Sequence, residues 1–136
     1  MADAGLKTAS LATLDAVLAV SAASSANSDA GDIGANTAAQ PTDISFQISV
    51  TQTGSTDTFS GSAKVQWSDD NTNWPDSDQG DVIFSWVAGS AGADLALSQI
   101  IVVPVAARYY RLRCTNDNAT DSVDFGIESA ALIYQS

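Results

Sequence analysis

The stretch KVQWSDDNTNW, Lys64 to Trp74, decides how the rest of the chain is interpreted. In its first half, Val65 and Trp67 alternate with polar neighbours, which is the period-two pattern of a strand with one buried face. Its second half, residues 68–73, is polar and rich in Asp and Asn, which hydrogen-bond their own backbone and tolerate left-handed conformations. The stretch therefore predicts an inner strand that runs into a polar turn, with Trp74 returning to the edge of the core.

A second stretch, ARYYRLRCTN at residues 107–116, shows the same alternation. One face carries Tyr110, Leu112 and Cys114, and the other carries Arg111, Arg113 and Thr115. We predict that this stretch and the first are inner strands of one antiparallel sandwich and lie against each other. Cys114 is expected to be a packed, inert thiol, because a single cysteine cannot form an internal disulfide and free cysteines are usually buried.

Other alternating or apolar stretches predict the remaining strands. They cover residues 16–22, 44–51, 81–87, 95–105 and 122–134, with a short edge strand at 30–34. Residues 11–18 fit helical and strand spacing equally well, and we favour a strand because the rest of the chain is β. Pro104 cannot donate to a ladder, so it predicts an edge or a strand terminus. The pattern predicts an all-β fold: an antiparallel β-sandwich, jelly-roll-like, with about seven or eight strands.

The chain of 136 residues is long enough for one domain and short for two. We expect residues 24–136 to form the sandwich and residues 1–23 to form an extended N-terminal arm or a first strand. No apolar run approaches the length of a membrane span. A cleaved signal peptide is not expected, because Asp15 interrupts the apolar run near the N-terminus.

The charge balance bears on the class of partner. Sixteen acidic and five basic residues give a formal charge of −11. Phosphate binding needs Lys and Arg, so neither a nucleic acid nor an anionic membrane is an expected partner. The acidic residues can keep the protein soluble or dock it onto a basic surface. Charged residues are only 15% of the chain, and such a surface suits a protein held in a large assembly.

The sequence contains no recognisable catalytic set. There is no His, no nucleophile motif, no glycine-rich phosphate loop and no metal-ligand spacing, so we expect a non-enzyme without cofactor or metal. A glycosidase with paired carboxylates stays open as an alternative, because acidic residues are plentiful.

A calcium site in the polar loop is a second alternative. Residues 69, 71 and 73 match the opening of an EF-hand loop, but Trp74 and Gly80 stand where that loop needs Gly and Glu. We therefore expect a solvated turn. Calcium bound by the wider acidic set stays open; that set is Asp69, Asp70, Asp76, Asp78 and Asp81.

Four residues are candidates for binding a partner or a glycan. Trp74 lies at a loop end and Tyr109 points away from the Tyr110 face, so these two rings can stack on a sugar or pack against a partner. Arg111 and Arg113 share a strand face and can grip a partner's carboxylate bidentately. The interpretation we favour is that Arg108, Arg111 and Arg113 pair with the protein's own Asp residues on adjacent strands.

The phrase VQWSDDNTNW, followed about thirty residues later by ARYYRLRCTN, resembles a pattern in a group of tailed-phage structural proteins. NSDAGDIGAN, residues 27–36, and DISFQISVTQTG, residues 43–54, resemble their opening and second strand. Asn71 stands where members of that group usually have Gly, and Asn also suits the turn. The same pair of phrases occurs in discoidin-like and other carbohydrate-binding sandwiches.

The phage resemblance implies a non-enzymatic virion protein. It would be a head decoration or cement protein on the capsid exterior, which binds the major capsid protein or another virion protein and bridges capsid subunits. A homotrimer is the expected assembly, because closed symmetry matches a lattice axis. The alternative is a glycan-binding sandwich, either a module of a phage tail or fibre or a secreted carbohydrate-binding domain.

Overall fold

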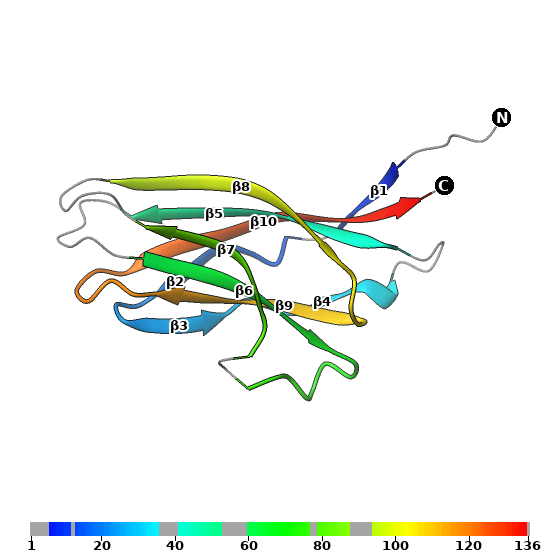
Figure 1. The fold of residues 1–136 in the computed structure, drawn as a ribbon, viewed down its shortest axis with the longest axis horizontal. Helices are drawn as coiled ribbons and strands as arrows, with labels where there is room; N and C mark the ends of the chain where they lie inside the picture. The colour runs from blue at the N-terminus through cyan, green and yellow to red at the C-terminus, as the bar shows by residue number, and fades with distance from the viewer. Residues whose placement is uncertain are drawn as a thin grey trace.

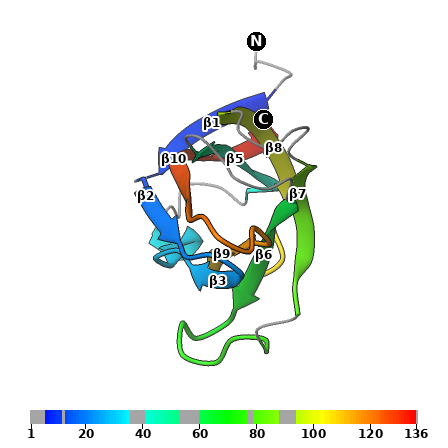
Figure 2. The same ribbon diagram turned by 90° about the vertical axis from the view of Figure 1, so that its left-hand side faces the viewer.

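The computed structural model describes residues 6–11, 13–35, 41–52, 60–76, 79–87 and 94–135. In these ranges the chain forms ten strands in two antiparallel sheets that stack face to face (Figures 1 and 2). Sheet A contains β1 (Leu6–Leu11), β2 (Asp15–Val20), β5 (Asp43–Gln52), β8 (Leu95–Pro104) and β10 (Val123–Gln135). Sheet B contains β3 (Ser24–Asn27), β4 (Gly31–Asp32), β6 (Ser60–Ser68), β7 (Asp81–Val87) and β9 (Tyr109–Asn116). A 3-10 turn, η1 (Ile33–Ala35), follows β4.

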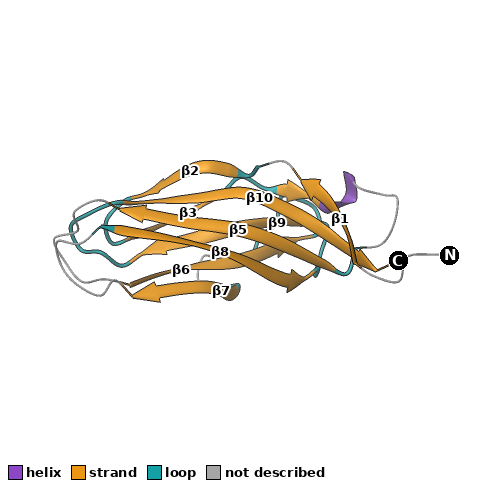
Figure 3. Ribbon diagram, turned by 90° about the horizontal axis from the view of Figure 1, so that it is seen from above, coloured by secondary structure: helices purple, strands orange, loops and turns teal. Residues whose placement is uncertain are grey.

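The strand order is that of a jelly roll, as the sequence predicts. Sheet A runs β2, β10, β5, β8, which Figure 3 shows side by side, and sheet B runs β3, β9, β6, β7. The first half of the chain therefore pairs with the second half: β2 with β10, β3 with β9, β5 with β8, and β6 with β7. Such pairing resembles one long hairpin rolled into two layers. It places the loop between β6 and β7 on the outer side of sheet B (Figures 1 and 2).

The core lies between the two sheets and is built by alternating side chains. In β5, Ile44, Phe46, Ile48 and Val50 are fully buried, and the polar residues between them face outward. The two stretches singled out in the sequence form β6 and β9, which pair directly, with Val65 opposite Leu112. The Tyr110 ring meets the Phe46 ring edge-on, with centroids 5.6 Å apart, so it joins sheet B to sheet A. Cys114 is buried, as predicted.

The N-terminal segment contributes more strands than the sequence indicates. Residues 6–11, expected to belong to an extended arm, form β1 along the end of β10. The short strand expected at 30–34 is β4, on the edge of sheet B. Next to it, β3 was not predicted. It consists of four small residues, three of them polar, which carry no alternation signal, and it pairs with β9 through an antiparallel ladder.

One smaller expectation is confirmed. Pro104 ends β8, an edge strand, where its missing N–H is not needed. Gly126 lies where the register between β10 and β2 shifts, which fits a bulge. In the described part of the chain, no helix has the length and apolar character needed to span a membrane.

Candidate functional site

The outer face of sheet B gathers most of the candidate residues. Along β9 the buried positions alternate with half-buried ones, so Tyr109, Arg111 and Arg113 all point away from the core. In the register of the sheet, Arg111 lies opposite Gln66 and Arg113 lies opposite Lys64. We call Lys64, Arg111 and Arg113 the basic face. It holds three of the five basic residues of a chain whose net charge is −11.

Arg111 is held between an aromatic ring and an amide. Its guanidinium carbon lies 4.4 Å from the centroid of the Trp74 ring, and its Nε donates to Oε1 of Gln66 over 2.9 Å. Gln66 is itself buried under the loop, where its Nε2 donates to the backbone oxygens of Gln79 (2.8 Å) and Asp76 (3.3 Å). The loop, the strand and the guanidinium thus form one connected unit, which fixes the direction in which Arg111 points.

Arg113 is oriented in a similar way by a neutral partner. Its Nη1 donates to Oδ1 of Asn27 on β3, 3.0 Å away. Within the described ranges, neither Arg113 nor Arg111 forms an ion pair with a carboxylate. Partial burial, and after it the nearby charge of Arg113, lowers the pKa of Arg111. The two guanidiniums therefore present positive charge that amides orient and that no described carboxylate neutralises.

Arg108 behaves differently from the other two. Its Nε and Nη2 donate to the two carboxylate oxygens of Asp32 over 2.9 and 3.2 Å, and this ion pair raises the pKa of Arg108. The expected pairing of arginine with the protein's own Asp therefore holds for Arg108. Among the described residues it does not hold for Arg111 and Arg113, whose neighbours in the sheet are Gln66, Asn27 and Lys64.

The two candidate aromatic residues do not form one platform. The Tyr109 ring lies under Arg108, whose guanidinium carbon is 5.0 Å from the ring centroid, whereas Trp74 stacks with Arg111. Each ring thus belongs to a different cation–π contact. Trp67, the other tryptophan of the first stretch, points inward and packs beside Tyr110 with ring centroids 6.1 Å apart.

The turn that carries Trp74 is organised by Asp70. Its carboxylate accepts hydrogen bonds from the backbone N–H groups of Asn73 (2.8 Å) and Thr72 (2.9 Å) and from the Asn73 side chain (2.6 Å). These bonds, first those from Asn73, hold the pKa of Asp70 well below its usual range. Asn71 adopts the left-handed conformation that the sequence led us to expect, with φ of 57°. Asp70 therefore serves as a cap for its own turn.

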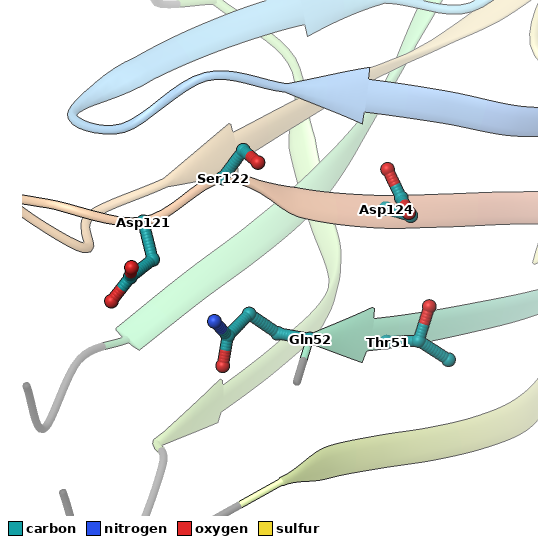
Figure 4. Close-up of a pocket in the computed structure, with 5 residues that line it drawn as sticks. All are labelled: Thr51, Gln52, Asp121, Ser122 and Asp124. Carbon is teal, nitrogen blue, oxygen red and sulfur yellow. The ribbon is translucent and has the colours of Figure 1, made fainter. Parts of the chain in front are cut away.

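The other acidic groups that the structure describes do not assemble into a metal site. Across the ranges that the structure describes, no cluster of three or more His, Cys, Asp or Glu side chains could hold a metal ion. Asp78, one of the acidic residues considered for calcium, lies outside those ranges. A recess of about 360 Å³ at the end of sheet A contains two carboxylates (Figure 4). It is lined by Thr51, Gln52, Asp121, Ser122 and Asp124.

Sequence reasoning found four of the residues on this face but missed two. Gln66 and Asn27 orient the arginines. In the sequence, Gln66 has the pattern of an ordinary outward polar residue of its strand, and Asn27 lies where no strand is predicted. Gln66 is buried only because the loop folds back over it, and periodicity carries no signal for that. Trp74 and Arg111 were singled out separately, and the structure brings them together.

Comparisons with known proteins give distant similarity only. No protein-family model and no curated protein sequence matches the chain. Three solved structures that resemble it each give a TM-score of 0.45. One is latent PorU from Porphyromonas gingivalis, at 11% identity over 93% of this chain and 13% of that one. Another is a mutant VP2 protein of infectious bursal disease virus, at 12% identity over 95% and 31%. The third is tailspike protein 4 of bacteriophage CBA120, at 11% identity over 97% and 18%. The chain thus spans less than a third of each, and no function follows from these similarities.

Proposed function

We propose that this chain is a non-enzymatic structural protein of a phage virion, which decorates the head and attaches to acidic groups of the capsid through the basic face. The proposed binding mode rests on the pair Arg111 and Arg113. Neutral amides orient both guanidiniums, and no carboxylate among the described residues forms an ion pair with either. The virion assignment is supported by the sequence resemblance to tailed-phage structural proteins.

The geometry suits recognition of carboxylates. A guanidinium offers a planar fork of donors that matches a carboxylate bidentately, and charge-assisted hydrogen bonds contribute about 1.5–3 kcal/mol each. The stack on Trp74 and the bond to Gln66 restrict Arg111 before any partner arrives. Less side-chain entropy is then lost on binding, which favours affinity. In this role the protein would bridge capsid subunits and stabilise the shell through contact area, without chemistry.

An acidic glycan is the second candidate ligand, and the Trp74–Arg111 stack favours it. An aromatic ring beside two guanidiniums suits a sugar that carries a carboxylate, because the ring packs on the apolar face of the sugar and the arginines bind its charge. A tail or fibre module that touches a host surface would use the same residues.

The test is reattachment of the purified protein to phage particles that lack it, measured by co-sedimentation. We expect Arg111→Gln combined with Arg113→Gln to weaken retention at least about tenfold, since two charge-assisted contacts are lost. Arg108→Gln is the matched control, because Asp32 already neutralises that arginine. Retention should also fall as salt is raised.

Each result decides something. If the double variant binds particles as well as Arg108→Gln does, the basic face is not the attachment surface. If wild-type protein is absent from purified virions, the virion role is wrong. If Trp74→Ala abolishes retention on an array of acidic glycans while particle binding is unchanged, the glycan role replaces the capsid role.

A further inference from the structure

In the described part of the chain, the edge of sheet A formed by β8 carries few of the features that usually keep sheet edges from pairing with other chains. Its one proline, Pro104, stands at the end of the strand. Natural edges are short, bulged, charged or covered, because unpaired N–H and C=O groups are a template for another strand. On the opposite edge of sheet A, β2 carries Asp15 and pairs with β10 through a register shift. In sheet B, β3 and β4 are four and two residues long, and β7 carries Asp81 and has a register shift against β6.

By contrast, β8 is long, regular and apolar. It pairs with β5 over ten residues, Leu95–Pro104, without a register shift. On its outward face Ile100 is 67% exposed and Val102 is 53% exposed, and Leu97 is 37% exposed along the same strand. The outward neighbours on β5 are polar, since Gln47 lies opposite Ile100 and Ser45 lies opposite Val102. Ile100 and Val102 thus form an apolar strip on the outward face of β8, the marginal strand of sheet A, whereas Leu97 lies on the inward face, opposite Val50. Figure 3 shows the position of β8 in the sheet.

The charge distribution indicates which partner fits this strip. From Leu95 to Ala107 the sequence contains no charged residue, although the chain as a whole carries −11. Two copies of this protein repel each other over most of their surface, and they repel least where an uncharged segment meets an uncharged segment. A basic partner would instead be attracted to the acidic surfaces and gain nothing from β8.

We propose that β8 pairs edge to edge with β8 of a second copy, so that the two A sheets become one continuous ten-stranded sheet about a twofold axis. Like strands related by a twofold axis run antiparallel, and the contact is self-complementary. A register centred on Ile101 places Ile100 of each copy opposite Val102 of the other, on the same outer face. Cross-strand pairs of β-branched residues are among those that stabilise antiparallel ladders.

This pairing goes beyond the proposed attachment and uses a different surface. The basic face belongs to the outer side of sheet B, whereas the pairing uses an edge of sheet A. It also differs from the trimer that the phage resemblance implies, because an isologous contact closes at two copies. Solution mass therefore separates the two assemblies.

The test is sedimentation velocity of the full chain from micromolar to millimolar concentration, with variants of the strip. We expect a monomer–dimer equilibrium in the wild type. Val102→Lys and Ile100→Lys should each raise the dimer dissociation constant at least about a hundredfold, because the twofold axis places each new charge in both copies of an apolar ladder. Val17→Lys is the matched control: Val17 is 68% exposed on β2, at the other edge of the same sheet.

A second measurement requires no variant. Backbone amides of β8 in the wild type should exchange with deuterium more slowly at high protein concentration than at low, whereas those of β7 should not change. A monomer at every concentration, a trimer, a dimer that both Lys variants leave intact, or concentration-independent exchange along β8 would each overturn the proposal. None of these results would bear on particle binding, which Arg111 and Arg113 test.

Discussion

Gly61 is a position where the missing side chain shapes the core. A Cβ at this residue would overlap the six-membered ring of Trp86 and would lie 2.7 Å from the backbone oxygen of Thr115. Because the space is open, Trp86 can lie across β6 and meet Phe125 of the other sheet edge-on, with centroids 5.3 Å apart. A single glycine on β6 thus permits an aromatic contact between the two layers.

Gly61→Ala should therefore destabilise the fold, by about 1–3 kcal/mol in the free energy of unfolding, which is typical of overpacking. Urea denaturation followed by far-ultraviolet circular dichroism measures it. Gly34→Ala is the comparison, because the atoms nearest its new Cβ belong to the flexible side chain of Arg108. Equal losses of stability in the two variants would show that Trp86 can move aside without cost.

At the scale of elements, the turn after β6 connects backbone conformation to the candidate site. Asn71 is left-handed, Asp70 caps the turn, and the loop then delivers Trp74 to Arg111. Left-handed backbone costs most residues about 1–2 kcal/mol, and Asn and Gly tolerate it best.

Asn71→Ala should accordingly lower the free energy of unfolding by about 1 kcal/mol, and Asn71→Gly should stay near the wild type. Thermal unfolding of the three proteins measures the difference. The near-ultraviolet spectrum reports whether the environment of Trp74 changes with it. If Asn71→Gly is as unstable as Asn71→Ala, side-chain contacts of Asn71 matter more than its φ angle.

The strands that the sequence predicts most clearly are those with one buried face. Along β5, β6 and β9, period-two alternation is strong because each strand contributes large side chains to the shared core. In contrast, β1 and β3 were missed. They pair through backbone groups at sheet edges, and small or polar residues serve there as well as any. Edge pairing depends on the unpaired backbone groups of the neighbouring strand, and a local sequence pattern carries no information about them.

The candidate site was predictable only in part, for a related reason. Residue type and alternation identified Arg111 and Arg113 as outward side chains that can bind a carboxylate, and its position at a loop end made Trp74 a candidate. Residue type and alternation could not identify the partner of each arginine, because Gln66 and Asn27 belong to the strands on either side of β9. Partners across a sheet follow from register, and register is fixed by the whole fold.

At the scale of the whole molecule, β9 carries two titratable groups into the space between the sheets. Burial raises the pKa of the Cys114 thiol to about 12, with a smaller effect from Asp15. Burial also raises the pKa of Tyr110 to about 12, with a smaller effect from Asp32. In the unfolded chain these groups ionise near about 8.5 and about 10. At neutral pH both groups are neutral in the folded and the unfolded chain, and their contribution to stability is fully present. As pH rises toward 12 the unfolded chain ionises first, so this contribution to the free energy of unfolding is lost.

The free energy of unfolding should then fall between about pH 9 and pH 12, by up to about 1.4 kcal/mol per pH unit for each group. Urea denaturation at a series of pH values measures the slope. Cys114→Ala should reduce the slope between about pH 8.5 and 10, before Tyr110 contributes. An unaltered slope in Cys114→Ala would contradict the assignment.

The two ends of the chain meet in one ladder, since Leu6 lies opposite Gln135 and β1 continues along β10 (Figure 1). A tensile load applied through the two termini would strip β1 from β10 one rung at a time, the geometry of least mechanical resistance. A load applied across the broad faces of the two layers would meet the interlocked side chains of the interior all together. A protein folded in this way should therefore resist force applied across its two sheets far better than force applied through its two termini.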